Sequence, residues 1–244
     1  MGPDGRFAPQ FEVRTPHRRS RKWPFVLLVS WKAFPSHFAC ENNAVNYCEL
    51  MDNPKRYIID AGRLPPEFPT HRHPAEFWTA LGRAVATFGF LEETLGKAIF
   101  SFTATRSYPE DEIDAAYNMW LPTLRRALSD PLGNLIDTFG KAAREHGSTT
   151  IENLNELLDD LRAASLVRNV ICHGSWRVPD RAGRSTPLFV NRVGEKFETA
   201  LDVTFLDQLQ RNTAGLACAV VNTVTHMGWQ FPGSSGPGEP ILRR

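Results

Sequence analysis

The stretch of sequence that decides the fold is residues 154–176, which read LNELLDDLRAASLVRNVICHGSW. From Leu154 through Leu161, apolar residues recur at steps of three and four, which is the spacing of one helix face. Gly174 stands near the end of the stretch, and glycine is the residue that most easily adopts the left-handed conformation past a helix end. We therefore predict a long helix that follows the capping residues 148–150 and ends at Gly174.

Three polar residues lie in the last turns of this helix. On a helical wheel at about 100° per residue, with Leu161 as zero, Arg168 falls at about −20°, in the middle of the apolar stripe. Asn169 and His173 fall at about +80° and +120°, side by side on its flank. A guanidinium is rarely buried without a partner, so Arg168 must face an anionic group or a polar cleft.

The other helices follow from the same periodicity and from capping signals. The first is expected to start after Pro74 and to run for roughly thirty residues. The others are predicted from near Pro109 to 128, from 131 to about 146, and from about 204 to 227.

Four residues within these helices break the pattern. Gly82, Gly89 and Gly96 recur at a seven-residue interval, and we attribute them to close approach of a neighbouring helix. Pro122 is expected to kink or break the second helix.

The pattern changes between the last two helices. Residues 175–179, 187–193 and 196–203 are rich in Val, Phe, Trp and Thr, with turn signals between them, which predicts a small antiparallel hairpin or three-stranded meander. Over 175–197 there are five basic and two acidic residues, so the segment carries +5 − 2 = +3. The predicted fold class is therefore all-α: an up-and-down bundle of about five helices, with a β-hairpin inserted before the last.

Proline distribution predicts the domain boundaries. Residues 1–73 are interrupted by proline throughout, and we expect a poorly structured extension. Met51 leads without interruption into the first strong helix, and our hypothesis is that residues 1–50 are not native. The folded domain is expected to span 74–229, with the insert at about 175–203. Residues 230–244 are rich in Gly, Pro and Ser, and are predicted to be disordered.

Net charge, the length of apolar runs and cysteine spacing bear on three classes of partner: nucleic acid, membranes and metals. A net charge of +1 gives no global field that would attract nucleic acid or a membrane. The apolar run 23–31 is too short to cross a bilayer and lacks a signal-peptide cleavage site, so we expect a cytoplasmic protein without a membrane partner. Of the four cysteines, Cys40 and Cys48 lie near His37, but their spacing fits no common zinc pattern, and we expect no metal or cofactor.

The polar residues at the helix end carry a family resemblance. Arg168-Asn169-x-x-x-His173 is similar to the Arg-x-x-x-x-His motif, in its Arg-Asn form, of the HEPN superfamily. The motif also ends a long helix of a helical bundle, and an upstream helix reads FGFLEETL over residues 88–95. The resemblance covers roughly residues 75–228.

The resemblance implies a metal-independent endoribonuclease, in which two copies line one interfacial cleft. His173 would be the general base or acid in attack of the ribose 2′-OH on the adjacent phosphate. Arg168 would stabilise the charged phosphorane, and Asn169 would orient the substrate. Implied partners are RNA, a second copy of the chain and, for a toxin or phage-defence protein, an antitoxin. The chemistry asks for the same residue types, since a group that titrates near neutrality moves protons and a permanent cation meets phosphate oxygens.

Weaker expectations surround the motif. Glu92 and Glu93 could help to position Arg168, although exposed carboxylates are the alternative. Arg177 and Arg181 of the basic insert could hold RNA backbone, and Glu92 is grouped with them as a substrate-binding candidate, although solvated charges would look the same in the sequence. Cys172 is expected to be a buried small side chain. Two alternatives to the nuclease stay open: a non-catalytic HEPN-like module that binds RNA, nucleotide or a protein, and a structural helical dimer in which Arg168 forms a buried ion pair.

Overall fold

The computed structural model of the chain describes residues 31–33, 59–146 and 153–234. The predictions made for residues 1–30, 34–58, 148–150 and 235–244 lie outside these ranges.

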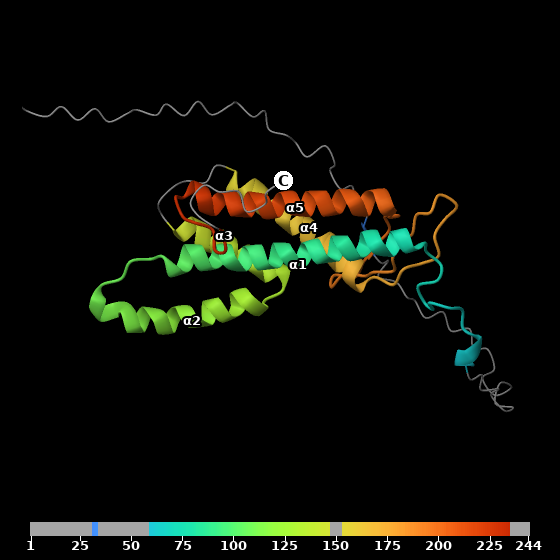
Figure 1. The fold of residues 1–244 in the computed structure, drawn as a ribbon, viewed down its shortest axis with the longest axis horizontal. Coiled ribbons are helices and arrows are strands. Elements are labelled where there is room, and N and C mark those ends of the chain that lie inside the picture. Colours follow the sequence, from blue (N-terminus) through green and yellow to red (C-terminus); the bar gives the residue numbers. More distant parts are fainter. Residues whose placement is uncertain (1–30, 34–58, 147–152, 235–244) are drawn as a thin grey trace, which may run out of the picture.

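Five α-helices form the fold: α1 (Ala75–Ala104), α2 (Ile113–Ser129), α3 (Leu132–Glu145), α4 (Leu154–His173) and α5 (Val203–His226). Successive helices run in opposite directions, so α1 and α5 lie parallel to each other (Figure 1). Two short 3-10 helices, η1 (Ala61–Arg63) and η2 (Glu110–Glu112), precede α1 and α2. The predicted all-α, up-and-down bundle is confirmed. Among the described residues, no helix is both long and apolar enough to span a membrane.

The centre of the core is α1, which packs against each of the other four helices. Its fully buried residues include Leu91 and Leu95, and those of α5 include Val220 and Val224. A side chain of this size stabilises a fold by about 1.5–3 kcal/mol when it is fully buried. The helix begins directly after Pro74, as predicted, because a proline needs no N–H partner at a helix start.

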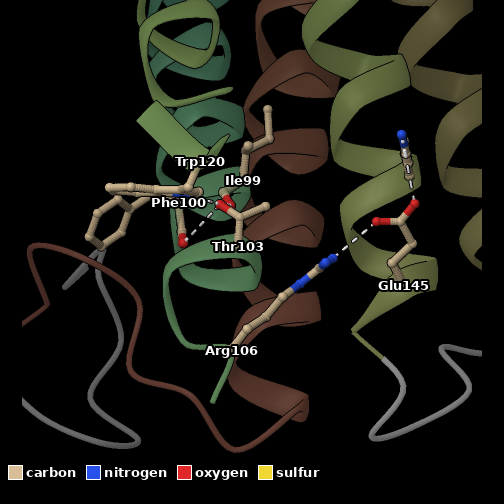
Figure 2. Close-up of polar contacts among 7 residues, drawn as sticks. Ile99, Phe100, Thr103, Arg106, Trp120 and Glu145 are labelled. Carbon is tan, nitrogen blue, oxygen red and sulfur yellow. Dashed lines mark hydrogen bonds and ion pairs between the residues drawn. The ribbon is translucent and has the colours of Figure 1, made fainter. Parts of the chain in front are cut away.

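Polar contacts tie the end of α1 to its neighbours α2 and α3 (Figure 2). The indole Nε1 of Trp120 donates a hydrogen bond to Thr103 Oγ1 at 2.9 Å, and Phe100 lies beside the same indole ring. Arg106, two residues past the end of α1, reaches Glu145 of α3 at 3.0 Å. Pro122 lies inside α2 without ending it, so the helix continues through the predicted break.

The insert between α4 and α5 contains the β structure. Strand β2 (Glu195–Phe197) pairs antiparallel with β1 (Trp31–Ala33), with Trp31 opposite Phe197. On its other side, Phe197 N donates to Phe189 O at 3.0 Å, which closes a hairpin within the insert. The small β insert is therefore present where it was predicted, but the partner of its regular strand comes from the N-terminal extension.

The ordered part of the chain is larger than the predicted domain of 74–229. In the lead-in, Thr70 O accepts a hydrogen bond from Trp78 Nε1 at 3.0 Å, and His73 is buried. After α5, Phe231 is only 4% exposed and belongs to the core. The extension predicted to be poorly structured and the tail predicted to be disordered therefore each contain residues that pack on the bundle, because aromatic side chains are large enough to anchor the backbone.

Close helix approach explains one of the three spaced glycines and not the other two. A Cβ at Gly96 would lie 2.8 Å from Ala127 O of α2, whereas a Cβ at Gly82 or Gly89 would have no neighbour within 4 Å. The prediction that a neighbouring helix approaches closely is thus correct for Gly96. It is wrong for Gly82 and Gly89, where no helix of the same chain lies close.

Alanine at these positions is expected to act in opposite directions. Gly89→Ala should raise the free energy of unfolding by about 0.5–1 kcal/mol, because it removes backbone freedom and creates no contact. Gly96→Ala should lower it by about 1–3 kcal/mol, because α2 must shift away from the new methyl group. Urea denaturation of both variants checks this, and a stabilising Gly96→Ala would contradict the observed α1–α2 packing.

Candidate functional site

Arg168 of α4 has an anionic partner on α1. Its Nη2 lies 3.3 Å from Glu92 Oε1, and the two side chains are 26% and 29% exposed. Its Nη1 donates to Asn169 Oδ1 at 3.4 Å. The structure therefore brings together Arg168, Asn169 and Glu92. The anionic partner that the sequence predicted for the guanidinium is the carboxylate of Glu92.

The position of Arg168 on the helix differs from the prediction. In the last two turns of α4 the buried residues are Val167, Val170 and Ile171, not the continuation of the stripe through Leu161. The face turned toward the core therefore rotates by roughly 130° along the helix. Arg168 consequently lies at the edge of the core and not in its middle.

The rotation leaves one side of the helix end open to solvent. Cys172 and His173 are exposed and Asn169 is half-buried. The expectation that Cys172 is buried is wrong. Partial burial of its thiol nevertheless raises the pKa of Cys172, with Arg168 opposing and Glu92 adding to the shift. A raised pKa lowers the thiolate fraction, so Cys172 is a poor nucleophile.

Glu92 keeps an unused acceptor. Its Oε1 is buried and accepts no hydrogen bond, because the contact with Arg168 lacks hydrogen-bond geometry. A buried carboxylate oxygen is costly to leave without a donor. The ion pair with Arg168 is therefore the only polar contact of this oxygen among the described residues, and it compensates the buried charge.

The basic residues of the insert stand apart from this group. Arg177 and Arg181 are exposed, and neither forms an ion pair within residues 59–146 and 153–234. Arg184, by contrast, is held by Asp180 at 2.9 Å. Contacts to Asp180 from Arg184 and Ala182 lower the pKa of that carboxyl group, which stabilises the turn. Among the described residues, the hydrogen bond and ion pair of Arg168 go to Asn169 and Glu92, not to the insert.

An aromatic cluster that the sequence did not reveal fixes the chain just past the motif. The ring of His73 stacks on Phe77 at a centroid distance of 4.4 Å and meets Trp78 edge-on at 5.3 Å. Trp176, three residues after His173, packs edge-on against Phe77 at 4.9 Å. The lead-in and the start of α1 thus contact the chain just past the end of α4. The sequence contains no local pattern for this cluster apart from a histidine, His73, in a proline-rich segment.

Gly174 does not take the predicted left-handed conformation. Its φ and ψ are −72° and 139°, which any residue can adopt. A Cβ there would lie 2.5 Å from Val170 O and 2.8 Å from Pro187 Cβ. Glycine is needed for close approach between the helix end and the insert, not for backbone handedness.

His73 should make folding stability depend on pH. Burial lowers its pKa below the ordinary value of 6.5, since the rings of Phe77, Trp78 and Trp176 offer no anion. The unfolded state then binds more protons as the pH falls through this value, so stability decreases toward low pH, with a slope of at most about 1.4 kcal/mol per pH unit. Urea denaturation between about pH 5 and 8 should show this slope for wild type and a shallower one for His73→Phe. Equal slopes would contradict it.

Comparison with known proteins gives no match: no family model, curated protein or solved structure matches the chain. Within the described residues, no cluster of three or more His, Cys, Asp or Glu side chains could hold a metal ion.

Proposed function

We propose that the chain is an endoribonuclease of HEPN type that cleaves RNA without a metal ion. The observation that carries the proposal is the arrangement at the end of α4. A half-buried guanidinium, Arg168, is held by Glu92 and Asn169, and an exposed imidazole, His173, lies on the open side of the same helix end. A fixed cation and an exposed imidazole at the same helix end are the two kinds of group that 2′-OH attack on a phosphodiester requires.

Each residue has a distinct role in the proposed reaction. His173 transfers the proton of the attacking 2′-OH or of the leaving 5′-oxygen, because it is exposed and reachable by a polymer. Arg168 donates hydrogen bonds to the non-bridging oxygens as negative charge develops there. Asn169 and Glu92 hold the guanidinium in place. Arg177 and Arg181 are proposed to contact the RNA backbone.

A second copy of the chain is proposed to complete the cleft. Leu166, on the open side of α4, is 51% exposed, and Gly89 of α1 has no neighbour within 4 Å of a Cβ. An exposed leucine and an open glycine near the motif suit close approach by another helix. We further propose a cytoplasmic toxin or phage-defence component, for which an antitoxin protein would be the third partner.

The decisive experiment incubates the purified full chain with single-stranded RNA in excess EDTA. We expect fragments ending in 2′,3′-cyclic phosphate, since the proposed reaction uses the ribose hydroxyl as nucleophile. Their absence over a wide range of RNA sequences, with correctly folded protein, would overturn the proposal.

A non-catalytic module is the second candidate, and one observation favours it. Arg168 is already neutralised by Glu92 at 3.3 Å, so phosphate must compete with a carboxylate for the guanidinium. In that case the chain binds RNA, nucleotide or a protein without cleavage. Binding that weakens steeply with salt, together with intact RNA, would identify this candidate. If the chain neither binds nor cleaves RNA, the pair is structural.

A further inference from the structure

The outer face of α2 is apolar, and the described residues of the bundle leave it exposed. Of its residues, only Ala116 and Ala127 are fully buried, so α2 contacts the bundle along a narrow line. By contrast, Ile113, Tyr117 and Leu128 are 51%, 54% and 80% exposed. The helix therefore has two apolar lines, and the bundle covers one of them.

The exposed line has the spacing of a helix-pairing seam. Ile113, Tyr117, Leu121, Leu124 and Leu128 follow one another at steps of four, four, three and four, and Leu121 and Leu124 are half-buried. On a helical wheel the seam is centred roughly 90° from the line of Ala116 and Ala127. Apolar residues at this spacing pack into the matching seam of another helix.

The seam is complementary to itself when two copies run antiparallel. Ile113 of one copy then lies opposite Leu128 of the other, Tyr117 lies opposite Leu124, and Leu121 lies next to the twofold axis. In a twofold interface each contact occurs twice, so a palindromic seam of this kind fits a second α2 without any offset.

Charges flanking the seam also match in this orientation. Asp114 and Arg125 lie on the same flank, within about 20° of each other on the wheel. Neither forms an ion pair within the described residues of a single chain. In the antiparallel pair, Asp114 of one copy faces Arg125 of the other on that flank. Residues 110–112, directly before α2, are also acidic, so the N-terminal end of the helix carries negative charge.

We infer that α2 is a self-association surface, on which a second copy of the chain docks its own α2 in antiparallel orientation. This surface is separate from the motif at the end of α4, and the inference does not rest on the proposed nuclease function. A chain with two different twofold surfaces forms tetramers or longer assemblies, whereas a chain with this surface alone forms dimers.

Sedimentation velocity of the full chain over about 1–100 μM tests the inference, since a single-helix interface suits micromolar association. Leu128→Asp should weaken self-association by at least about tenfold, because it places a carboxylate in the seam. Met119→Asp is the matched control. Met119 is 75% exposed on the opposite side of α2, so this variant should associate like wild type. Both variants should fold normally, as judged by melting temperature.

Charge reversal tests the orientation. Asp114→Arg and Arg125→Asp should each weaken association, because each puts like charges opposite one another twice per dimer. The double variant Asp114→Arg/Arg125→Asp should associate more tightly than either single variant. A monomeric wild type up to about 100 μM, equal effects of Leu128→Asp and Met119→Asp, or no recovery in the double variant would overturn the inference.

RNA cleavage distinguishes this surface from the proposed catalytic interface. Where wild type cleaves RNA, Leu128→Asp should retain its activity within about twofold, because α2 contributes no residue to the motif. Leu166→Asp, on the open side of α4, should lose activity and leave the α2 association intact. If Leu128→Asp lost both, the two surfaces would be one interface and the inference would be wrong.

Discussion

His173→Ala is expected to lower kcat for RNA cleavage by about 100- to 10,000-fold, which is the usual contribution of one general acid or base. The imidazole is exposed in the last turn of α4, so its removal breaks no packing contact. The free energy of unfolding should therefore stay within about 0.5 kcal/mol of wild type. Single-turnover cleavage of a labelled RNA, together with a urea denaturation curve, separates the two effects.

A matched control is available in the same chain. His226 is also an exposed histidine in the last turn of a helix, at the end of α5. His226→Ala should cleave RNA at the wild-type rate, because it lies outside the motif. Arg168→Lys should be as inactive as Arg168→Ala, since an ammonium cannot reproduce the planar, two-donor contact. Equal activity of the two histidine variants would exclude His173 as the catalytic group.

The helices could be predicted because their signals are local. Pro74 at the start of α1, Asp130-Pro131 before α3 and apolar steps of three and four lie within each segment, and the structure places the helices accordingly. Asp202 at the start of α5 accepts a hydrogen bond from Phe205 N at 2.7 Å, which is a capping contact between near neighbours. The antiparallel order of α1 to α4 follows, because short connections join these helices. The longer insert between α4 and α5 leaves the direction of α5 to be set by its packing on α1.

The features that the sequence did not give depend on contacts between distant segments. A wheel assumes one constant core direction, but the insert and α1 turn the buried face of α4 toward Val167 and Ile171. Trp31–Ala33 pairs with a strand far along the chain, and no local pattern encodes that partner. His73 is buried because Phe77 and Trp176 meet there.

In the candidate site, too, the residues that share one helix could be predicted, and the contacts between helices could not. Arg168, Asn169 and His173 could be found because their spacing within one helix is itself the signal. Of the two glutamates suggested to position Arg168, the structure puts Glu92 at 3.3 Å from it, whereas Glu93 pairs with Lys97 at 2.7 Å. The buried, unused oxygen of Glu92 could not be predicted, because the geometry of a contact between two helices sets it.

Gly174→Ala is expected to be among the most destabilising single-methyl changes in the chain. The backbone angles at this residue suit alanine, so the cost comes from contact alone. The new Cβ would lie 2.5 Å from Val170 O and 2.8 Å from Pro187 Cβ, and neither neighbour is the end of a flexible side chain. The end of α4 must therefore separate from the insert, at a cost of about 1–3 kcal/mol.

The two consequences of Gly174→Ala can be measured separately. Tm should fall by about 2–4 °C for each kcal/mol lost in a chain of this length. The hydrogen bond from Gly174 N to Val170 O, now 2.8 Å, should lose its protection from hydrogen exchange. RNA cleavage should fall as well, because the last turn of α4 carries His173. Gly89→Ala, in contrast, should leave hydrogen exchange at Gly174 unchanged, because Gly89 lies on α1 and has no neighbour within 4 Å of a Cβ. A Gly174→Ala variant as stable as wild type would show that the glycine is not required for close packing, and that the helix end can move away from Pro187 without strain.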